Sequence, residues 1–225
     1  MSGLVHAATE TMLRAQRRLD IVAINIANGS TPGFKPVADA GSYAEAAAKL
    51  RARVDQGKLE ATGRPLDLAI AGEGLFRVRD GDRFLYTRQG SFALDGEGRV
   101  ATPQGYVLQQ AGGGDLELSR GDVTIAADGV VSEGDRPIAL LALYAAPQGQ
   151  APAAIDGSLF TIADAEEVAA PHLRQGMLES STVALGDEMI ATMTALRQAD
   201  AGGRVMQVWD DLMGRAVTTF GQVGR

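Results

Sequence analysis

The sequence contains no cysteine among its 225 residues, and only 5% of its residues are aromatic. The lack of cysteine excludes disulfides, thiolate-bound metals and cysteine nucleophiles. Few aromatics argue against one large core, and alanine and glycine take their place. The formal net charge is -7, with no block of basic residues. Nothing therefore favours binding to nucleic acid or to an anionic membrane surface.

Long apolar runs are also missing. No run approaches the roughly 18 apolar residues that cross a bilayer, so we expect no membrane insertion. Residues 1–18 lack the continuous apolar stretch of a secretory signal peptide, because polar side chains interrupt it throughout. We therefore expect a chain that carries no cleaved signal peptide.

Residues suited to catalysis are few and scattered. His6 and His172 are the only histidines, and neither has the neighbouring serine and aspartate of a nucleophile arrangement. The glycine-rich segment at residues 71–75 lacks the Lys-Ser/Thr ending of a phosphate loop. The acidic residues of the turns lack the spacing of a calcium loop. The sequence predicts no enzyme, no cofactor and no metal.

Apolar residues recur in steps of three and four at both ends of the chain, over residues 4–28 and from Met177 to Phe220. These patterns predict two amphipathic helices, and such narrow stripes are typical of pairing with another helix. A terminal helix docked on its own domain is the alternative. The first stripe comprises Leu4, Ala8, Met12, Ala15, Leu19, Val22 and Ile26. The second includes Leu185, Met189, Thr192, Leu196, Ala199, Gly203 and Met206, with Ala199 and Gly203 small enough to let another backbone approach.

The first helix is predicted to end at a turn over residues 27–35. Asn28 and Gly29 tolerate the left-handed conformation that closes a helix, and Pro32 disfavours a helical conformation at the residue before it. Phe34 then adds a large ring to an otherwise polar turn. We expect this ring to be exposed and to pack on a neighbouring helix or subunit.

The middle of the chain has the pattern of a β-domain. More than half of the 28 glycines lie between Gly57 and Gly134, where strand-sized apolar segments alternate with Asp-Gly turns. This pattern predicts antiparallel hairpins. Residues 138–144 are predicted to form one continuous central strand, and residues 159–162 another. The alanine-rich residues 36–57 are predicted to be a connector, with helix propensity from Tyr43 to Arg53.

These elements predict an α+β fold that is mainly β with terminal helices, the helices forming a coiled-coil-like core beside a central antiparallel β-domain. The expected domains are residues 1–35 (helix and turn), 36–57 (connector), 58–170 (β-domain) and 171–225 (C-terminal helix).

Three separated motifs resemble those of the bacterial flagellar axial proteins of the rod and hook. Residues 25–35, Asn-Ile-Ala-Asn-Gly-Ser-Thr-Pro-Gly-Phe-Lys, are similar to the family signature Asn-x-Ala-Asn-x-x-Thr-x-Gly-Phe-Lys. The middle motif covers residues 62–70, 74–78, 86–92 and 105–108, and the last covers residues 176–183. The short connector between Lys35 and Lys58 makes the resemblance greatest to the proximal rod protein, and next to the distal rod protein.

The resemblance implies a structural subunit of the flagellar basal-body rod, the periplasm-spanning drive shaft that transmits torque and encloses the export channel. Its partners would be other rod and hook axial proteins, further copies of itself and the flagellar type III export apparatus. The residues expected to make assembly or packing contacts are Leu19, Ile26, Asn28, Pro32, Gly33, Phe34, Lys35, Leu185, Met189, Leu196 and Met206. The alternative is a β-domain binding module with helical oligomerisation arms, which would require a concave, aromatic-lined surface.

Overall fold

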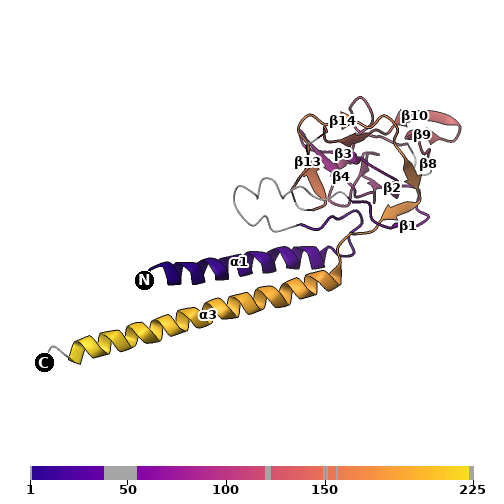
Figure 1. Ribbon diagram of the computed structural model, residues 1–225. Coiled ribbons are helices and arrows are strands. Elements are labelled where there is room, and N and C mark those ends of the chain that lie inside the picture. The colour runs from indigo at the N-terminus through magenta and orange to yellow at the C-terminus, as the bar shows by residue number, and fades with distance from the viewer. Residues whose placement is uncertain are drawn as a thin grey trace. The chain divides into compact units, whose positions relative to one another are not determined.

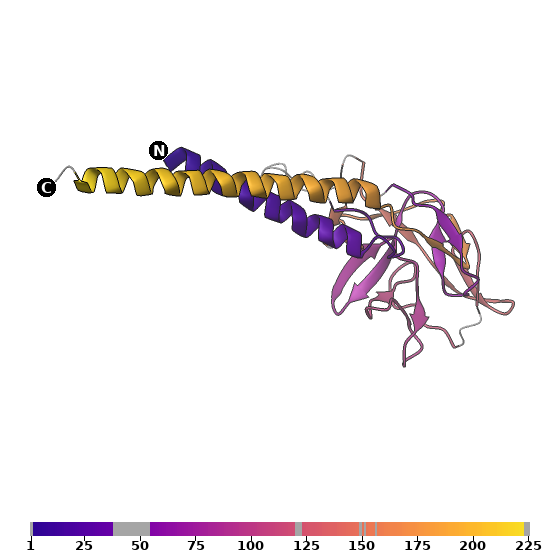
Figure 2. The ribbon, with the colours of Figure 1, turned by 90° about the horizontal axis from the view of Figure 1, so that it is seen from below.

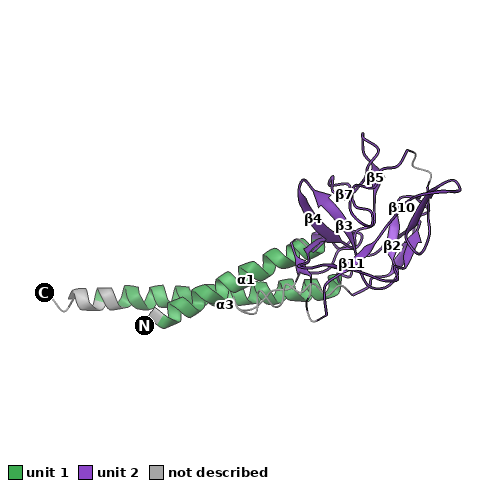
Figure 3. Cartoon of the chain, turned by 90° about the horizontal axis from the view of Figure 1, so that it is seen from above, with its two compact units in different colours: residues 1–26, 184–225 green, residues 27–183 purple. Residues whose placement is uncertain are grey.

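A computed structural model describes residues 2–37, 55–119, 123–148, 150, 152–155 and 157–222. The helix propensity predicted from Tyr43 to Arg53 lies outside the described residues. The chain divides into two compact units (Figure 3). The helical unit comprises residues 1–26 and 184–225, and the β unit comprises residues 27–183.

The helical unit consists of α1 (Ser2–Ala27) and α3 (Leu185–Gln222), which lie side by side (Figures 1 and 2). The two helices are antiparallel: Asn25 Nδ2 donates to Glu188 Oε1 at 2.8 Å, and Met12 lies against Gly202. At 1.5 Å per residue, α1 is roughly 39 Å and α3 roughly 57 Å long. No helix in the described part of the chain has the length and apolar character needed to cross a membrane.

The second helix begins later than the sequence predicts. Met177–Glu179 forms strand β16, and α3 starts at Leu185. Strand β16 pairs with β1 (Leu59–Ala61) in an antiparallel register that sets Glu60 opposite Leu178. This long-range pairing overrides the helical pattern read at residues 177–184, because sheet partners satisfy the backbone there.

The β unit contains sixteen short strands among the described residues (Figure 1), all of whose pairings are antiparallel. Beside β1 and β16 they are β2 (Leu68–Ile70), β3 (Leu75–Asp80), β4 (Arg83–Thr87), β5 (Ala93–Leu94), β6 (Val100–Ala101), β7 (Val107–Leu108), β8 (Thr124–Ile125), β9 (Val130–Glu133), β10 (Arg136–Leu140), β11 (Leu143–Ala145), β12 (Ala153–Ala154), β13 (Leu159–Thr161), β14 (Glu166–Glu167) and β15 (Leu173–Gln175). The predicted α+β fold, mainly β with terminal helices, is confirmed.

The largest sheet has nine strands and is built around the β3–β4 hairpin. Its order is β12-β13-β4-β3-β7-β6-β5, with β11 also paired to β3 and β14 paired to β11. A second sheet has the order β10-β9-β8, and two further pairs are β1-β16 and β15-β2. Asp-Gly turns close the β3–β4 and β8–β9 hairpins, where Gly81 and Gly129 have φ of 58° and 92°. The predicted hairpin turns are confirmed at these positions.

The prediction of one central strand over residues 138–144 is wrong. Strand β10 lies at the edge of the three-stranded sheet, whereas β11 belongs to the nine-stranded sheet. Between them, Leu141 N donates to Gly129 O at 2.8 Å and Leu140 O accepts from Ala111 N at 2.7 Å. Both hydrogen bonds lie outside the strand ladders. Residues 138–144 therefore leave the three-stranded sheet and enter the nine-stranded sheet. The strand predicted at residues 159–162 is confirmed as β13.

The β unit contains two apolar clusters, of which the larger includes Phe76 and Phe92. The Phe76 and Phe92 rings meet edge to face with centroids 5.5 Å apart. The other buried members of this cluster come from the nine-stranded sheet, from the three-stranded sheet, from the β15-β2 pair and from loops. They are Leu68, Ile70, Val78, Leu85, Val100, Leu108, Leu116, Leu118, Val123, Ile125, Val131, Leu141, Leu143, Leu159 and Leu173. Aliphatic side chains thus supply most of this larger cluster, whereas three aromatic residues, Tyr86, Tyr144 and Phe160, supply most of the smaller one.

Candidate assembly site

The eleven residues predicted to make assembly contacts fall into two groups. Asn28, Pro32, Gly33, Phe34 and Lys35 lie in the turn that begins the β unit. Leu19, Ile26, Leu185, Met189, Leu196 and Met206 lie on the two helices. We describe the turn first.

The turn after α1 has the conformation that its residues predict. Thr31 N donates to Asn28 O at 3.0 Å, and the Thr31 hydroxyl donates to Asn28 Oδ1 at 3.0 Å. Gly33 has φ of 70°, and a Cβ at this position would lie 2.5 Å from the backbone of Arg88. Only glycine fits so close to a second backbone at positive φ. The helix stop predicted here is confirmed, with Asn28 and Pro32 half-buried.

Phe34 is not exposed, so that prediction is wrong. Only 1% of the residue is accessible, and its ring lies against the backbone of Gly157. A Cβ on Gly157 would lie 2.7 Å from two ring carbons. Because Gly157 has no side chain, the Phe34 ring can pack against its backbone within the same chain. The sequence did not predict this contact because the two residues are far apart along the chain.

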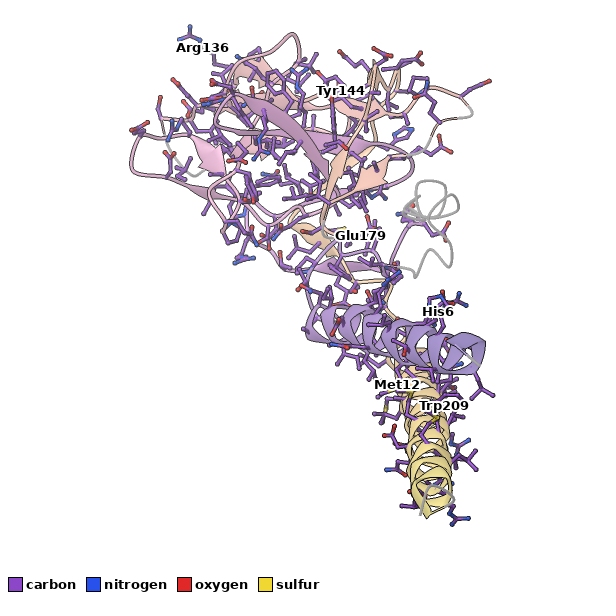
Figure 4. The ribbon with its side chains drawn as sticks, turned by 90° about the vertical axis from the view of Figure 1, so that its left-hand side faces the viewer. His6, Met12, Arg136, Tyr144, Glu179 and Trp209 are labelled. Carbon is purple, nitrogen blue, oxygen red and sulfur yellow. The ribbon has the colours of Figure 1, made fainter. Side chains whose placement is uncertain are left out.

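A buried ionic cluster lies next to Phe34. Lys35 Nζ donates to Glu179 Oε1 at 2.5 Å, and Arg88 Nε donates to Glu179 Oε2 at 2.9 Å. All three side chains have no accessible surface. Gly57 N donates to Glu179 Oε1 at 2.8 Å as well. One carboxylate on β16, labelled in Figure 4, thus accepts hydrogen bonds from three separate segments of the chain.

The two cations of the cluster have further acceptors. Lys35 Nζ also donates to the carbonyl oxygen of Asp55. Arg88 Nη1 donates to the carbonyl oxygens of Gly72 and Gly74 at 2.8 and 2.7 Å. Burial lowers the pKa of Lys35, while the hydrogen bond and charge of Glu179 act in the opposite direction. The carboxylate of Glu179 therefore offsets the desolvation cost of burying the Lys35 and Arg88 cations.

Backbone hydrogen bonds add to this cluster. Gly33 N donates to Glu179 O at 2.7 Å, Thr182 N to Phe34 O at 3.2 Å, and Ser180 N to Lys58 O at 2.8 Å. The residues that follow α1 and the residues that precede α3 are thereby held together inside the β unit. We call this region, residues 33–35 with Arg88 and Glu179, the joint.

Sequence reasoning assigned no role to Arg88 or Glu179, although both lie inside the quoted motifs. A signal was present only for Glu179, a charged residue that directly follows the apolar Met177 and Leu178, whereas Arg88 stands among the polar residues Thr87 and Gln89. Charged residues are almost never fully buried unless they are paired. The partner of each could not be identified, because the pairing joins residues that are distant in sequence.

The two helices meet along a line of small residues, which we call the helix seam. Ala8, Ala15 and Val22 of α1 and Ala195 and Gly202 of α3 are buried there. Met12, labelled in Figure 4, lies over Gly202, where an added Cβ would meet Met12 Cγ at 2.6 Å. The predicted close approach thus occurs at Gly202 rather than at Gly203. Leu19 and Met206 are half-buried beside the seam.

The remaining predicted helix residues are exposed. The accessible fraction is 43% for Ile26, 51% for Leu185, 59% for Met189 and 50% for Leu196. The sequence argument had paired Ile26 with these large side chains, either in one chain or between copies. Within the chain the small residues pair instead, because they let two helix backbones approach closely. A role for the large residues in contacts between subunits stays a prediction.

The two adjacent glycines of α3 allow a matched test of the helix seam. A Cβ at Gly203 would meet nothing, so we expect Gly203→Ala to stabilise the helical unit by about 1 kcal/mol through helix propensity alone. Gly202→Ala gains the same propensity but crowds Met12, which we expect to make it at least about 1 kcal/mol worse than Gly203→Ala. Urea unfolding followed by the fluorescence of Trp209 measures both. Equal stabilisation by the two substitutions would contradict the described seam.

The alternative of a binding module can be checked against one hollow of the β unit. One hollow of about 520 Å³ in the β unit is lined by Ala127, Asp128, Leu140, Leu141, Glu167, Val168, Ala169, Ala170, Pro171 and His172. This lining includes no phenylalanine, tyrosine or tryptophan. The aromatic-lined surface that carbohydrate or peptide binding would require is therefore absent from this hollow.

Three family models match the chain. Residues 6–35 match the flagella basal body rod protein, residues 69–133 match the flagellar hook protein FlgE/F/G D1 domain, and residues 174–219 match the flagellar basal body rod FlgEFG protein C-terminal. The first match ends at Lys35, and the third contains Glu179. The matched segments therefore contain both ends of the ionic cluster.

Curated relatives match over nearly the whole chain. The flagellar basal-body rod protein FlgF of Escherichia coli is 30% identical over 94% of this chain and 96% of its own length. FlgF of Caulobacter vibrioides is 29% identical over 99% of this chain and all of its own length. The flagellar basal-body rod protein FlgG of Borreliella burgdorferi is 27% identical, covering 96% and 98%.

Proposed function

The chain belongs to the family of bacterial flagellar rod and hook axial proteins, as a structural subunit of the rod type, and we propose that its two helices build the basal-body rod. The family is structural and not enzymatic. The chain acts with other axial proteins in the flagellar basal body.

One observation carries the role given to the helices. After α1 and α3 have paired, large apolar residues still face solvent along α3, including Leu185, Met189 and Leu196 at 50% exposure or more. A 38-residue helix with apolar residues outside its seam leaves much surface for other subunits to cover. Helix contacts that join different faces of neighbouring copies propagate into tubes and filaments.

Three finer statements belong to the same proposal. The rod containing this chain spans the periplasm, transmits torque and encloses the export channel. The chain reaches the rod through the flagellar type III apparatus without a cleaved signal peptide. Its neighbours are further copies of itself and other rod and hook proteins. These statements rest on the family resemblance, and the exposed helix residues support the last of them.

We also propose that the joint orients the helices for assembly. In the cluster of Lys35, Arg88 and Glu179, ion pairs connect the segment that follows α1 with the segment that precedes α3. Arg88 Nη2 is buried without a hydrogen-bond partner among the described residues, but the other hydrogen bonds of the cluster join it to several segments of the chain and favour one local geometry. The turn thus acts as a structural joint and not as a contact surface, since Phe34 is buried within the chain.

The proposal is tested by placing a charge on the exposed surface of α3. Leu196→Asp puts a carboxylate where an apolar contact is expected, and we expect it to abolish swimming in cells that lack the native copy. The side chain is exposed in the single chain, so we expect the change to cost the isolated protein within about 0.5 kcal/mol. Soft-agar swimming and electron microscopy of isolated basal bodies measure assembly.

The control is Gln198→Asp, which adds the same charge at an exposed polar position of the same helix. We expect this variant to swim normally. Circular dichroism of purified Leu196→Asp checks that both units remain folded. Normal rods in cells carrying Leu196→Asp would refute the role of this helix surface.

A further inference from the structure

We propose that Asn28, in the turn after α1, is a site of spontaneous deamidation, and that the hydroxyl group of Thr31 assists the reaction. The sequence contains only two asparagines, Asn25 and Asn28, and only Asn28 is followed by a glycine. The backbone nitrogen after an asparagine reaches the side-chain amide most readily when it belongs to glycine, because no Cβ hinders rotation of the peptide. This chemistry does not depend on the proposed rod function.

The reaction replaces the side-chain amide of Asn28 by a carboxylate. The backbone nitrogen of Gly29 attacks Asn28 Cγ, the new C–N bond closes a succinimide ring, and Nδ2 leaves as ammonia with the proton that the Gly29 nitrogen gives up. Solvent water then opens the ring at either carbonyl carbon. Attack at Cγ gives aspartate. Attack at the backbone carbonyl carbon gives isoaspartate, in which the main chain runs through Cβ and Cγ.

The turn places a hydrogen-bond donor on the oxygen that becomes negatively charged in the first step. Thr31 Oγ1 donates to Asn28 Oδ1 at 3.0 Å, and Thr31 N donates to Asn28 O at 3.0 Å. When the Gly29 nitrogen attacks Cγ, the double bond to Oδ1 opens and Oδ1 becomes an oxyanion. A donor that already points at this oxygen lowers the energy of the charged intermediate. Thr31 therefore favours closure of the ring.

Water reaches this turn from a hollow in the β unit. Gly29 and Ser30 line this hollow of about 370 Å³ together with Ser180 and Ser181. Asn28 and Gly29 are half-buried, and Ser30 is exposed. The second step, which consumes water, can therefore proceed in the folded chain.

Asn25 has the opposite setting and serves as an internal reference. It is buried within α1, and its Nδ2 donates to Glu188 Oε1 at 2.8 Å. The next residue is Ile26, whose branched side chain crowds the peptide that would have to rotate. We therefore expect Asn25 to keep its amide.

Deamidation changes the turn that leads into the joint. Isoaspartate lengthens the main chain by an atom between residues 28 and 29, and Gly33 cannot shift to absorb it. Gly33 N donates to Glu179 O at 2.7 Å, and a Cβ on Gly33 would lie 2.5 Å from the backbone of Arg88. Either product also puts a negative charge at the C-terminal end of α1, whose last turn contains no basic residue. The helix dipole disfavours negative charge at that end.

Incubation of the purified full-length chain for several weeks at mildly alkaline pH tests the site. Peptide mass spectrometry with fragmentation measures, at each asparagine, the mass increase that accompanies replacement of the amide by a carboxylate. We expect this increase at Asn28 and not at Asn25. Gly29→Ala should deamidate at least about tenfold more slowly, because the added Cβ hinders rotation of the peptide.

Two substitutions of Thr31 measure its part in the reaction. Thr31→Val keeps the shape of the side chain without the donor, and it should slow deamidation by roughly two- to tenfold, the effect of one neutral hydrogen bond. Thr31→Ser keeps the donor and should deamidate like the unchanged chain. In concentrated urea the turn is lost, so Thr31→Val and the unchanged chain should deamidate at equal rates there. Circular dichroism before incubation shows that each variant is folded.

Stability after incubation shows whether the modification alters the joint. The urea midpoint of the β unit should fall in the incubated unchanged chain and stay constant in Asn28→Ser, which has no amide to lose. An unmodified Asn28, an equal rate at Asn25, or an equal rate in Gly29→Ala would overturn the proposed site. If folded Thr31→Val reacts as fast as the unchanged chain, or is slowed equally in urea, the hydroxyl group does not assist. Equal midpoints in the modified chain and in Asn28→Ser would show that the joint tolerates the product.

Discussion

Replacing Glu179 by alanine is expected to lower the free energy of unfolding of the β unit by about 3–5 kcal/mol. The carboxylate accepts from Lys35 at 2.5 Å and from Arg88 at 2.9 Å, in a site with no accessible surface. Its removal leaves two cations buried without a counter-charge, and it also removes the acceptor of Gly57 N. Such a loss is a large fraction of the total stability of a typical domain.

The measurement is urea unfolding of the full-length chain. Tyr86, Tyr106 and Tyr144 lie in the β unit, and the single tryptophan, Trp209, lies on α3. Near-ultraviolet circular dichroism of the tyrosines therefore follows the β unit, while Trp209 fluorescence follows the helical unit. The control is Glu167→Ala on β14, where the side chain is exposed and a change of less than about 0.5 kcal/mol is expected.

A double substitution shows whether the charges are the cause. Lys35→Met removes one of the cations, so its effect combined with Glu179→Ala should be smaller than the sum of the two single effects. Residues that share one ionic network couple in this way, whereas independent sites add. If the effects of the two substitutions simply add, or if Glu179→Ala costs no more than Glu167→Ala, the cluster does not hold the joint together.

The fold class could be predicted from the sequence because its signals are local. The helix stop needs only Asn28, Gly29 and Pro32, and the hairpins need only strand-sized segments with Asp-Gly between them. Errors arose where distant segments decide the outcome. Residues 177–179, predicted to be helical, form strand β16 because they pair with β1. Residues 138–144 do not form one strand because their two ends belong to different sheets.

The candidate site shows the same division. Periodicity found the apolar stripes of α1 and α3, but it favoured the large residues as the contact between them. The seam is made by Ala15, Ala195 and Gly202 instead, because helix backbones come closest where side chains are smallest. Large side chains outside the seam are then left exposed. The predicted stripe of α1 did include Ala8, Ala15 and Val22, which are buried, but on α3 the pattern named Ala199 and Gly203 as the small residues of close approach instead of Ala195 and Gly202.

The burial of Phe34 leads to the second large effect. We expect Phe34→Ala to destabilise the β unit of the isolated chain by about 3–5 kcal/mol, since a fully buried ring would be replaced by a cavity. The ring is 1% exposed and lies against the backbone of Gly157, where no side chain is present. Tyrosine circular dichroism during urea unfolding measures the loss.

Phe84→Ala is the matched control for Phe34→Ala. Phe84 is 49% exposed and meets Arg77 with the guanidinium carbon 5.1 Å from the ring centre, so we expect it to cost only about 1 kcal/mol. The comparison separates two roles that the motif at residues 25–35 permits. A ring that served only to contact another subunit would leave the isolated monomer as stable as before, and equal effects of the two substitutions would favour that role. A loss confined to Phe34→Ala places the ring in the fold of the joint, so that this part of the motif acts on assembly through the geometry of the chain itself.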